Sequence, residues 1–474
     1  MIRTKIYILL TIVGIVISSC KAPDLGRQNV YKSVPASYNN SQDSTNTGML
    51  GWKQFYDDPN LAALIDSALA NNQELNIALQ EIVVSQNEVM EKKGEILPNV
   101  SGNVGGGVDK VGRYTAQGAL EATTEIEPGK EMPEPMTDFT IGFKASWEVD
   151  IWRQLRNGRD AAAKRFLASY EGKNYMVTNL VAEIAESYYN LLAYDNQLAI
   201  VNQNIEIQTN ALEIVKAQKQ AARVTELAVK RFEAEVYKTR SLQFTIQQEI
   251  VEAENRINFL VGRFPQRVQR SSVEIITLVP MDIQEGIPIQ LLDNRPDIRR
   301  AENMLEASKL DIKIAKADFY PKLEIGAQMG INAFNPEYII RPQSIIYNVI
   351  GDLMAPLINR KVIKAKYYSA NSRQIQAMYE YEQTLLKAYI EVANQISKID
   401  NLTKSYDLKA KQVEALSESI RISSDLFLSA RADYMEVLMT QRDVLEAKFE
   451  LVDTKKEQMV ATINAYRALG GGWK

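Results

Sequence analysis

The segment from Phe139 to Ile151 alternates apolar and polar residues over thirteen positions. Its odd positions are all apolar, and its even positions are polar, charged or glycine. A period of two predicts a β-strand with one apolar face and one polar face. At about 3.4 Å per residue this strand would be roughly 44 Å long, which is more than a tilted transmembrane strand needs. A strand of a soluble sheet can show the same alternation. The choice between a soluble strand and a transmembrane strand therefore depends on the rest of the chain.

Most of the remaining chain has the pattern of α-helix. After the linker, the first predicted helix begins near Pro59, with Asp58 as its N-cap and the proline at the first helical position. A second helix is expected from about Gln73 to Ile96, and Thr225 is the expected N-cap of the helix that ends near Phe259. Proline-free helical patterns then run over about 152–222, 225–259, 359–430 and 434–468. Strands are predicted only at about 98–108, 138–151, 321–333 and 344–357, and the polar segment 109–137 is expected to be a loop.

The order of these elements occurs twice. Arg223 and Gly262 are 39 residues apart, and so are Arg431 and Gly470. We therefore expect a two-fold internal repeat of helix, strand, loop, strand and long helical hairpin. The predicted organisation is a signal peptide (1–19), a lipid anchor with a linker (20–57), a first repeat (58–265), an equatorial connector (266–293) and a second repeat (294–474).

The N-terminus indicates export. Arg3 and Lys5 precede an apolar segment, Ile6 to Ile17, that is too short to span a bilayer as a helix. Ser18, Ser19 and Cys20 then resemble a bacterial lipobox, in which the cysteine is lipidated. The alternative is an ordinary secretory signal followed by an unmodified cysteine.

Composition argues against several classes of function. The chain has no histidine and one cysteine, so nucleophile systems with histidine, histidine-ligated metals and intrachain disulfides are excluded. We expect no metal site, no cofactor and no enzymatic activity, although an enzyme of the cell envelope remains an alternative. A net charge of −4 with interspersed signs also argues against nucleic-acid binding.

Four amphipathic strands cannot close a membrane barrel by themselves. Known barrels have eight strands or more, and an open edge in lipid leaves backbone groups unpaired at several kcal/mol each. Assembly of two copies would supply eight strands, and assembly of three copies would supply twelve. A soluble coiled-coil scaffold is a further alternative, which the alternating strands disfavour.

Two motifs resemble those of the TolC-like outer membrane efflux proteins, in the lipoprotein branch that serves resistance-nodulation-division pumps. These motifs are RPDIRRAE at 295–302 and ALGGGW at 468–473. The resemblance implies a mainly α homotrimer with a 12-stranded membrane β-barrel and a long periplasmic α-helical barrel. It implies anchoring in the lipid of the outer membrane of a Gram-negative bacterium. The expected partners are a periplasmic adaptor and an inner-membrane pump, and the expected function is passive export of small molecules. A duct for type I protein secretion is the alternative within this class.

The resemblance also implies a gate at the periplasmic tip. The two hairpin turns would contain Arg223, Val224, Thr225, Arg431 and Ala432. The gate residues carried over are Asp433, Glu436, Gln441 and Arg442, although charged residues on a helix surface are more often only solvated. Met439 stands where the family often has aspartate, which departs from the family pattern.

In the expected barrel, the odd strand positions face lipid and the even positions face the duct. The predicted lipid-facing residues are Phe139, Ile141, Phe143, Trp147, Leu323 and Ile325.

Overall fold

The computed structural model describes residues 23, 34–38, 44–356, 358, 360–429 and 431–474. The predicted signal peptide and Cys20 lie outside these residues. The described chain divides into two compact units, each with segments from both halves of the sequence. The sheet unit includes 83–166 and 303–378, and the hairpin unit includes 44–82, 167–302 and 379–474. Since a compact unit is not the same as a sequence repeat, the repeat boundaries at 58, 265 and 294 remain predictions.

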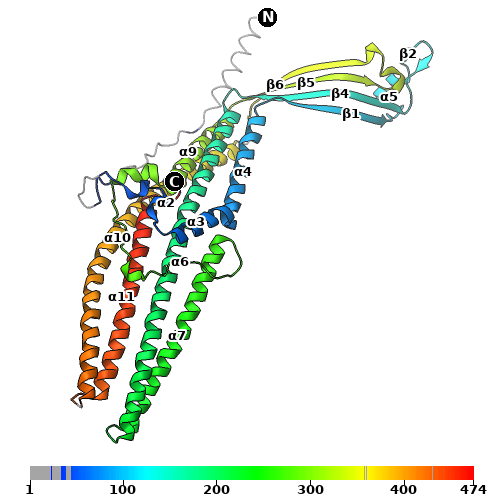
Figure 1. Ribbon diagram of the computed structural model, residues 1–474. Helices are drawn as coiled ribbons and strands as arrows, with labels where there is room; N and C mark the ends of the chain where they lie inside the picture. The colour runs from blue at the N-terminus through cyan, green and yellow to red at the C-terminus, as the bar shows by residue number, and fades with distance from the viewer. Residues whose placement is uncertain (1–22, 24–33, 39–43, 357, 359, 430) are drawn as a thin grey trace. The chain divides into compact units, whose positions relative to one another are not determined.

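Four strands form one antiparallel sheet in the order β1-β4-β5-β6 (Figure 1). They are β1 (Asn99–Asp109), β4 (Met136–Val149), β5 (Lys322–Ala333) and β6 (Ile345–Met354). The four predicted strands therefore exist, with ends shifted by up to three residues. Strand β4 ends before Asp150 because that carboxylate accepts hydrogen bonds from the backbone N–H groups of Leu155 and Arg156 and thereby caps the following helix.

The expectation of a loop at 109–137 was wrong in part. This connection contains α5 (Ala116–Glu121) and a small hairpin of β2 (Glu125–Glu127) and β3 (Lys130–Glu131). Thr115 caps α5 by accepting from the Gly118 N–H at 3.1 Å, and Gly129 supplies the positive φ that the hairpin turn requires. The polar composition concealed these short elements because they have no periodicity long enough to detect.

The helices confirm the two-fold repeat. Helices α4 and α9 each have 22 residues, α6 and α10 have 67 and 68, and α7 and α11 have 36 and 35. The helices are α2 (Trp52–Phe55), α3 (Pro59–Asn71), α4 (Gln73–Gly94), α6 (Gln154–Gln220), α7 (Glu226–Val261), α8 (Leu291–Asn294), α9 (Pro296–Ala317), α10 (Lys361–Leu428) and α11 (Tyr434–Ala468). In the hairpin unit, α6 pairs with α7 and α10 pairs with α11 (Figure 1).

Two predicted N-caps have different outcomes. Asp58 accepts from the Asn60 N–H at 2.8 Å and precedes Pro59, as predicted. Thr225 does occupy the N-cap position of α7, but its side chain makes no capping hydrogen bond. The first turn of α7 is therefore held without the side-chain cap that its sequence suggests.

The core of the hairpin unit joins the N-terminal helices to both hairpins. Leu61 and Ile65 of α3 are fully buried against residues of α6, α7 and α11. Phe55 stacks on Tyr466 with ring centroids 3.9 Å apart. Within the described residues, no helix combines the length and the apolar character that crossing a membrane would require.

Candidate functional sites

The register of the sheet sorts its residues by chemistry. Phe143 lies opposite Gly102 on one side and Met329 on the other, and Met329 lies opposite Tyr347. Residues opposite one another share a face, so the four strands form a common apolar face. Beyond the pair of Val108 and Thr137 at one end of the sheet, every residue on that face is apolar or glycine. Its members are Val100, Gly102, Val104, Gly106, Phe139, Ile141, Phe143, Ala145, Trp147, Val149, Leu323, Ile325, Ala327, Met329, Ile331, Ala333, Ile345, Tyr347, Val349, Gly351 and Leu353.

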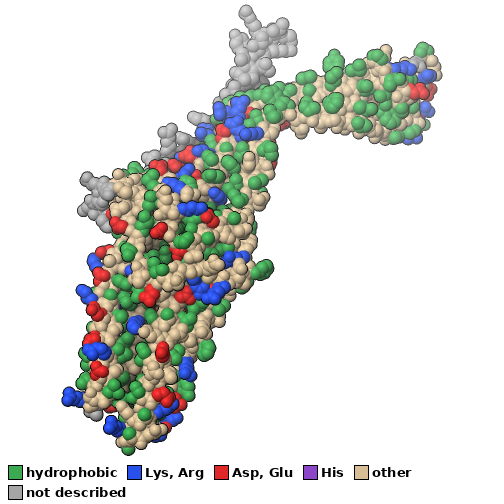
Figure 2. Space-filling model, in the orientation of Figure 1, with side chains coloured by type: hydrophobic (Ala, Val, Ile, Leu, Met, Phe, Trp, Pro, Cys, Tyr) green, Lys and Arg blue, Asp and Glu red, His purple; other side chains and the backbone are tan. Residues whose placement is uncertain are grey.

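The opposite face is mainly polar. Lys144 lies opposite Ser101 and Gln328, and Gln328 lies opposite Asn348. The apolar exceptions are Met136 at the start of β4 and Ile346, Ile350 and Met354 on the edge strand β6. All six residues predicted to face lipid lie together on the apolar face, where Phe143 is 66% exposed. Figure 2 shows hydrophobic side chains at the surface of the sheet. Apolar area this extensive requires a non-aqueous partner.

Two glycines let neighbouring strands approach closely on the polar face. A Cβ atom added to Gly142 would lie 2.6 Å from the Met329 carbonyl oxygen, and one on Gly330 would meet the Ile141 carbonyl oxygen. Glycine at such a position marks a bend or a close backbone approach in a strand. Any other residue at this pair would force the two strands apart.

The turn between α6 and α7 has a Schellman-type end. Arg223 donates its backbone N–H to the Gln218 carbonyl at 2.9 Å, and Ala222 has a φ of +55°. Lys219 and Glu226 form an ion pair across the turn, and this contact lowers the pKa of the Glu226 carboxyl. Val224 packs on a cluster that includes Phe232. The turn is therefore fixed by backbone bonds, by this ion pair and by one half-buried side chain.

The second turn resembles the first. Arg431 donates its N–H to the Leu426 carbonyl at 2.9 Å, and Ala432 follows it. Asp433 caps α11 through the Met435 N–H. Tyr434, Phe427 and Leu438 pack on the same cluster as Val224, so the two hairpins contact one another near their turns.

The predicted gate residues do not form one cluster within the chain. Asp433, Glu436 and Arg442 are exposed, and Arg442 lies 3.7 Å from Asp443. Gln441 is only 3% exposed, and its side-chain oxygen lacks a hydrogen-bond partner among the described residues. Six residues separate Glu436 from Arg442, which places them about 120° apart around the helix. Contacts between these groups would have to involve other copies of the chain.

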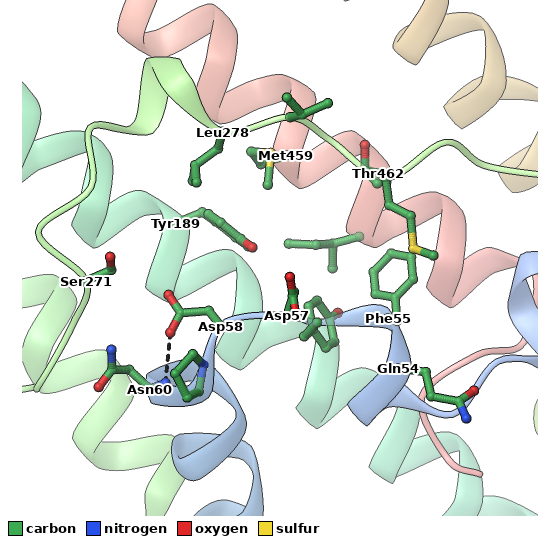
Figure 3. A pocket seen from close by; sticks show the side chains of 15 residues that line it. Gln54, Phe55, Asp57, Asp58, Asn60, Tyr189, Ser271, Leu278, Met459 and Thr462 are labelled. Atoms are coloured by element: carbon green, nitrogen blue, oxygen red, sulfur yellow. Dashed lines mark hydrogen bonds between the residues drawn. The ribbon is translucent and has the colours of Figure 1, made fainter.

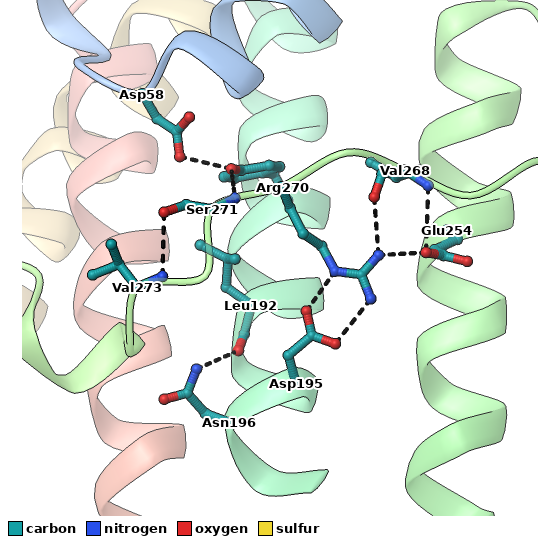
Figure 4. A network of polar contacts seen from close by, with 10 residues as sticks. Asp58, Leu192, Asp195, Asn196, Glu254, Val268, Arg270, Ser271 and Val273 are labelled. Carbon is teal, nitrogen blue, oxygen red and sulfur yellow. Dashed lines mark hydrogen bonds and ion pairs between the residues drawn. The ribbon is translucent and has the colours of Figure 1, made fainter. Parts of the chain in front are cut away.

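The connector between the repeats is held by a polar network that the sequence did not predict (Figure 4). Arg270 binds Asp195 of α6 and Glu254 of α7, and its side chain is 13% exposed. Burial lowers the pKa of Arg270, but the two carboxylates more than offset this effect and raise it. Ser271 donates its N–H to the Tyr188 hydroxyl at 3.1 Å. These contacts hold the connector against α6 and α7, the two helices of the first hairpin.

A cavity of about 610 Å³ lies beside this network (Figure 3). Phe55, Leu278 and Met459 line it with apolar groups, and Tyr189 points into it. Burial raises the pKa of the Tyr189 hydroxyl to about 12, so this group stays protonated at physiological pH. The carboxylate of Asp58 already has hydrogen-bond partners, since it caps α3 and accepts from the Tyr188 hydroxyl. Among the described residues, no group of acidic or cysteine side chains could hold a metal ion.

The two motifs of the second repeat meet in the structure. Arg295 is 5% exposed and donates to the Ala468 carbonyl at 3.1 Å. It also forms ion pairs with Asp297 and Glu391. Trp473 donates its indole N–H to the Asn294 carbonyl at 3.1 Å. The motifs therefore act together in fixing the end of α11 to the start of α9.

Comparison with known proteins agrees with this architecture. The sequence profile of a family described as outer membrane efflux protein matches residues 64–263 and 287–471. The chain is 26% identical to the cation efflux system protein CusC of Escherichia coli O6:H1, over 98% of each chain. It is also 26% identical to the pyoverdine export outer membrane protein OpmQ of Pseudomonas aeruginosa, over 89% of this chain and 87% of OpmQ.

Solved structures show the same fold. The crystal structure of CusC aligns with a TM-score of 0.83 at 24% identity, covering 95% of this chain and 99% of CusC. The outer membrane channel MtrE of Neisseria gonorrhoeae aligns with a TM-score of 0.82 at 21% identity, covering 96% of this chain and 98% of MtrE. Two profile matches, one in each half, span most of the sequence. The chain therefore belongs to the outer membrane efflux protein family and is a protein of the outer membrane.

Proposed function

We propose that the chain is the outer-membrane exit duct of a tripartite efflux system. In this proposal it conducts small molecules passively from an inner-membrane resistance-nodulation-division pump, through a periplasmic adaptor, to the exterior. The observation that carries the proposal is the sheet, because its register gathers an uninterrupted apolar face over four strands. Neither of the relatives named above is described as a protein-secretion duct, so type I secretion is not favoured.

The sheet supports assembly into a closed barrel. Strands β1 and β6 are its edges, so each has one side without a partner strand among the described residues. Unpaired edges in hydrocarbon are unstable, and closure by further copies removes them. Three copies would supply twelve strands, with the apolar face in lipid and the polar face toward the duct.

The long helices support the same assembly. Tyr237, Phe244 and Val251 of α7 are exposed at intervals of seven residues, and Tyr379 and Leu386 repeat this spacing on α10. Apolar residues at heptad spacing are typical of surfaces that pack against another helix. We infer that α7 of one copy packs against α10 of the next and so closes a helical barrel.

The proposal also includes lipid anchoring at Cys20 and the domain boundaries expected from the sequence. A lipidated Cys20 would tether each copy to the outer membrane through the linker. Mass spectrometry of the mature N-terminal peptide tests this point, since an unmodified cysteine would contradict it.

Arginine substitutions on the two sheet faces test the membrane assignment. Phe143→Arg on the apolar face should destabilise the inserted protein by about 2–4 kcal/mol near the bilayer midplane. Ser146→Arg on the polar face should leave stability nearly unchanged. Denaturant unfolding in lipid vesicles measures both. Equal destabilisation by the two variants would contradict the proposed orientation of the sheet.

Conductance tests the proposed gate at the tip. If Glu436 and Arg442 hold neighbouring copies together there, the double variant E436Q/R442Q should show higher single-channel conductance in planar bilayers. The matched control is K404Q/D400N, which neutralises an exposed ion pair on α10, away from the turns. Conductance equal to that of the wild type would remove both residues from the gate.

A further inference from the structure

Each of the four crossings between the sheet and the helices carries an exposed cation. Lys93 and Lys316 each lie six residues before the first residue of a strand, β1 or β5. Arg153 immediately precedes α6, and Lys361 is the first residue of α10. We call Lys93, Arg153, Lys316 and Lys361 the basic collar. The crossings all lie at the same end of the sheet because the strands pair in register there.

The charge of the basic collar is not neutralised by its surroundings. Within the described residues, no carboxylate lies within ion-pair distance of its four cations. Among the nearby acids, Glu95 pairs with Lys92 and Glu148 pairs with Lys322. Asp150 caps α6 with its side chain 3% exposed, and Asp318 accepts a hydrogen bond from Gln154. The segment 355–378 contains five basic residues and no acidic one, although the whole chain has a net charge of −4. The positive charge is therefore local to the crossings (Figure 2).

Aromatic side chains occupy the same level as the basic collar. Trp152 stacks on Tyr320 at 4.6 Å and donates its indole N–H to the Pro321 carbonyl at 2.7 Å. Trp147 donates its indole N–H to the Ile96 carbonyl at 3.0 Å. Both rings remain more than a third exposed. Anchored, half-exposed Trp and Tyr rings are typical of the boundary between membrane and water.

Three zones thus follow one another at the crossings that leave β4 and enter β5: the apolar face, the aromatic rings and the cations. Trp147 extends the aromatic zone to the crossing before β1 through its bond to Ile96. This order matches that of a phospholipid leaflet, in which acyl chains, the interfacial region and the phosphates succeed one another. Lysine and arginine at this depth bury their apolar stems and keep their charge among the head groups. If the basic collar only contacted water, the neighbouring aromatic rings and apolar face would have no role beside it.

We propose that the basic collar binds the phosphate head groups of anionic phospholipids in the leaflet next to the helical end of the sheet. The inference rests on the proposed insertion of the sheet into the outer membrane. It adds the class of lipid that the chain prefers and the four residues that select it. Each cation near a membrane surface is expected to contribute about fivefold to the affinity for anionic lipid, and this contribution is reduced by salt.

The experiment compares lipid retention by native mass spectrometry of the assembled protein. Phosphatidylglycerol and phosphatidylcholine with identical acyl chains are added in equal amounts. The wild type should retain more phosphatidylglycerol than phosphatidylcholine. In K93Q/R153Q/K316Q/K361Q this ratio should fall at least about fivefold. The charge-preserving variant K93R/R153K/K316R/K361R should keep it. The control K238Q/R240Q/K404Q/K411Q removes the same number of Lys and Arg from exposed helix positions and should also keep it.

Three results would overturn the inference: no phosphatidylglycerol preference in the wild type, a preference that survives neutralisation of the basic collar, or an equal loss in the control. Channel formation in planar bilayers of phosphatidylcholine separates this test from the proposed function. The collar variant should conduct like the wild type there. If the wild type forms no channel in any bilayer, the proposed function fails and the inference fails with it.

Discussion

The two repeats end in the same junction built with different side chains. Helix α7 ends at Gly262 with a φ of +77°, and α11 ends near Gly470 with a φ of +88°. A Cβ atom on Gly262 would lie 2.5 Å from the Asn71 carbonyl oxygen. A Cβ atom on Gly470 would lie 2.6 Å from the Asn294 carbonyl oxygen. The backbone geometry of the two junctions is therefore nearly identical.

The residue that follows the carbonyl differs between the two repeats. In the first repeat, Asn72 donates from its amide to the Leu260 carbonyl at 2.8 Å and accepts from the Leu75 N–H. In the second repeat, the equivalent residue is Arg295, which donates to the Ala468 carbonyl at 3.1 Å. Both side chains satisfy a carbonyl that the end of a helix would otherwise leave unpaired.

The difference shows how a duplicated junction can acquire new contacts while keeping its backbone. Asn72 acts only on its own surroundings, because a neutral amide needs no counter-ion. Arg295 buries a charge and so requires Asp297 and Glu391. Burial lowers the pKa of Arg295, but these carboxylates more than offset it and raise the pKa above its usual value. The second junction therefore also ties α10 to α9.

The largest effect is expected for Arg295→Met. This substitution removes the donor to Ala468 and leaves Asp297, which is 17% exposed, without its counter-ion. Loss of one partner of a buried ion pair costs about 3 kcal/mol or more. The midpoint of denaturant unfolding in detergent measures it. Arg240→Met, at an exposed position of α7, is the control and should change stability by less than about 0.5 kcal/mol.

Alanine at the two glycines should give the next largest effect, equal in the two repeats. Gly262→Ala and Gly470→Ala each combine an unfavourable positive φ with a close approach to a backbone carbonyl. We expect about 2 kcal/mol for each. Gly158→Ala, in helix α6 where a Cβ atom has room, should be neutral or stabilising. A clear difference between the first two variants would show that the junctions are not equivalent.

Asn72→Ala should have the smallest effect of the three. It removes one buried hydrogen bond to Leu260 and one cap on α4, which together amount to about 1–2 kcal/mol. Asn72→Asp should cost more than alanine, because aspartate keeps the cap but sets a buried carboxylate, which has no counter-ion, against the Leu260 carbonyl. The same unfolding midpoint measures both variants. A loss for Asn72→Ala as large as that for Arg295→Met would remove the proposed distinction between a neutral and a charged junction.

The sequence by itself determined the elements and their repetition. Alternation over Phe139–Ile151 specified a strand because side chains of a strand point alternately to opposite faces. Equal spacing from Arg223 to Gly262 and from Arg431 to Gly470 specified equal helices, since helix length depends on residue number. The motifs at 295–302 and 468–473 identified the family, which the profile match confirmed. Short elements such as α5 were not predicted, because they have too few residues to show a periodic pattern.

Only the tertiary structure decided what the strands and motifs do together. Register between β1 and β4 depends on backbone pairing, which no single segment encodes, and it placed glycine-rich β1 on the same apolar face as Phe143. Arg270 meets Asp195 and Glu254 across long separations in sequence, so neither partner could be deduced from spacing. The same holds for Arg295 and the end of α11. Local patterns fix the period of an element, whereas long-range contacts follow from packing of whole elements.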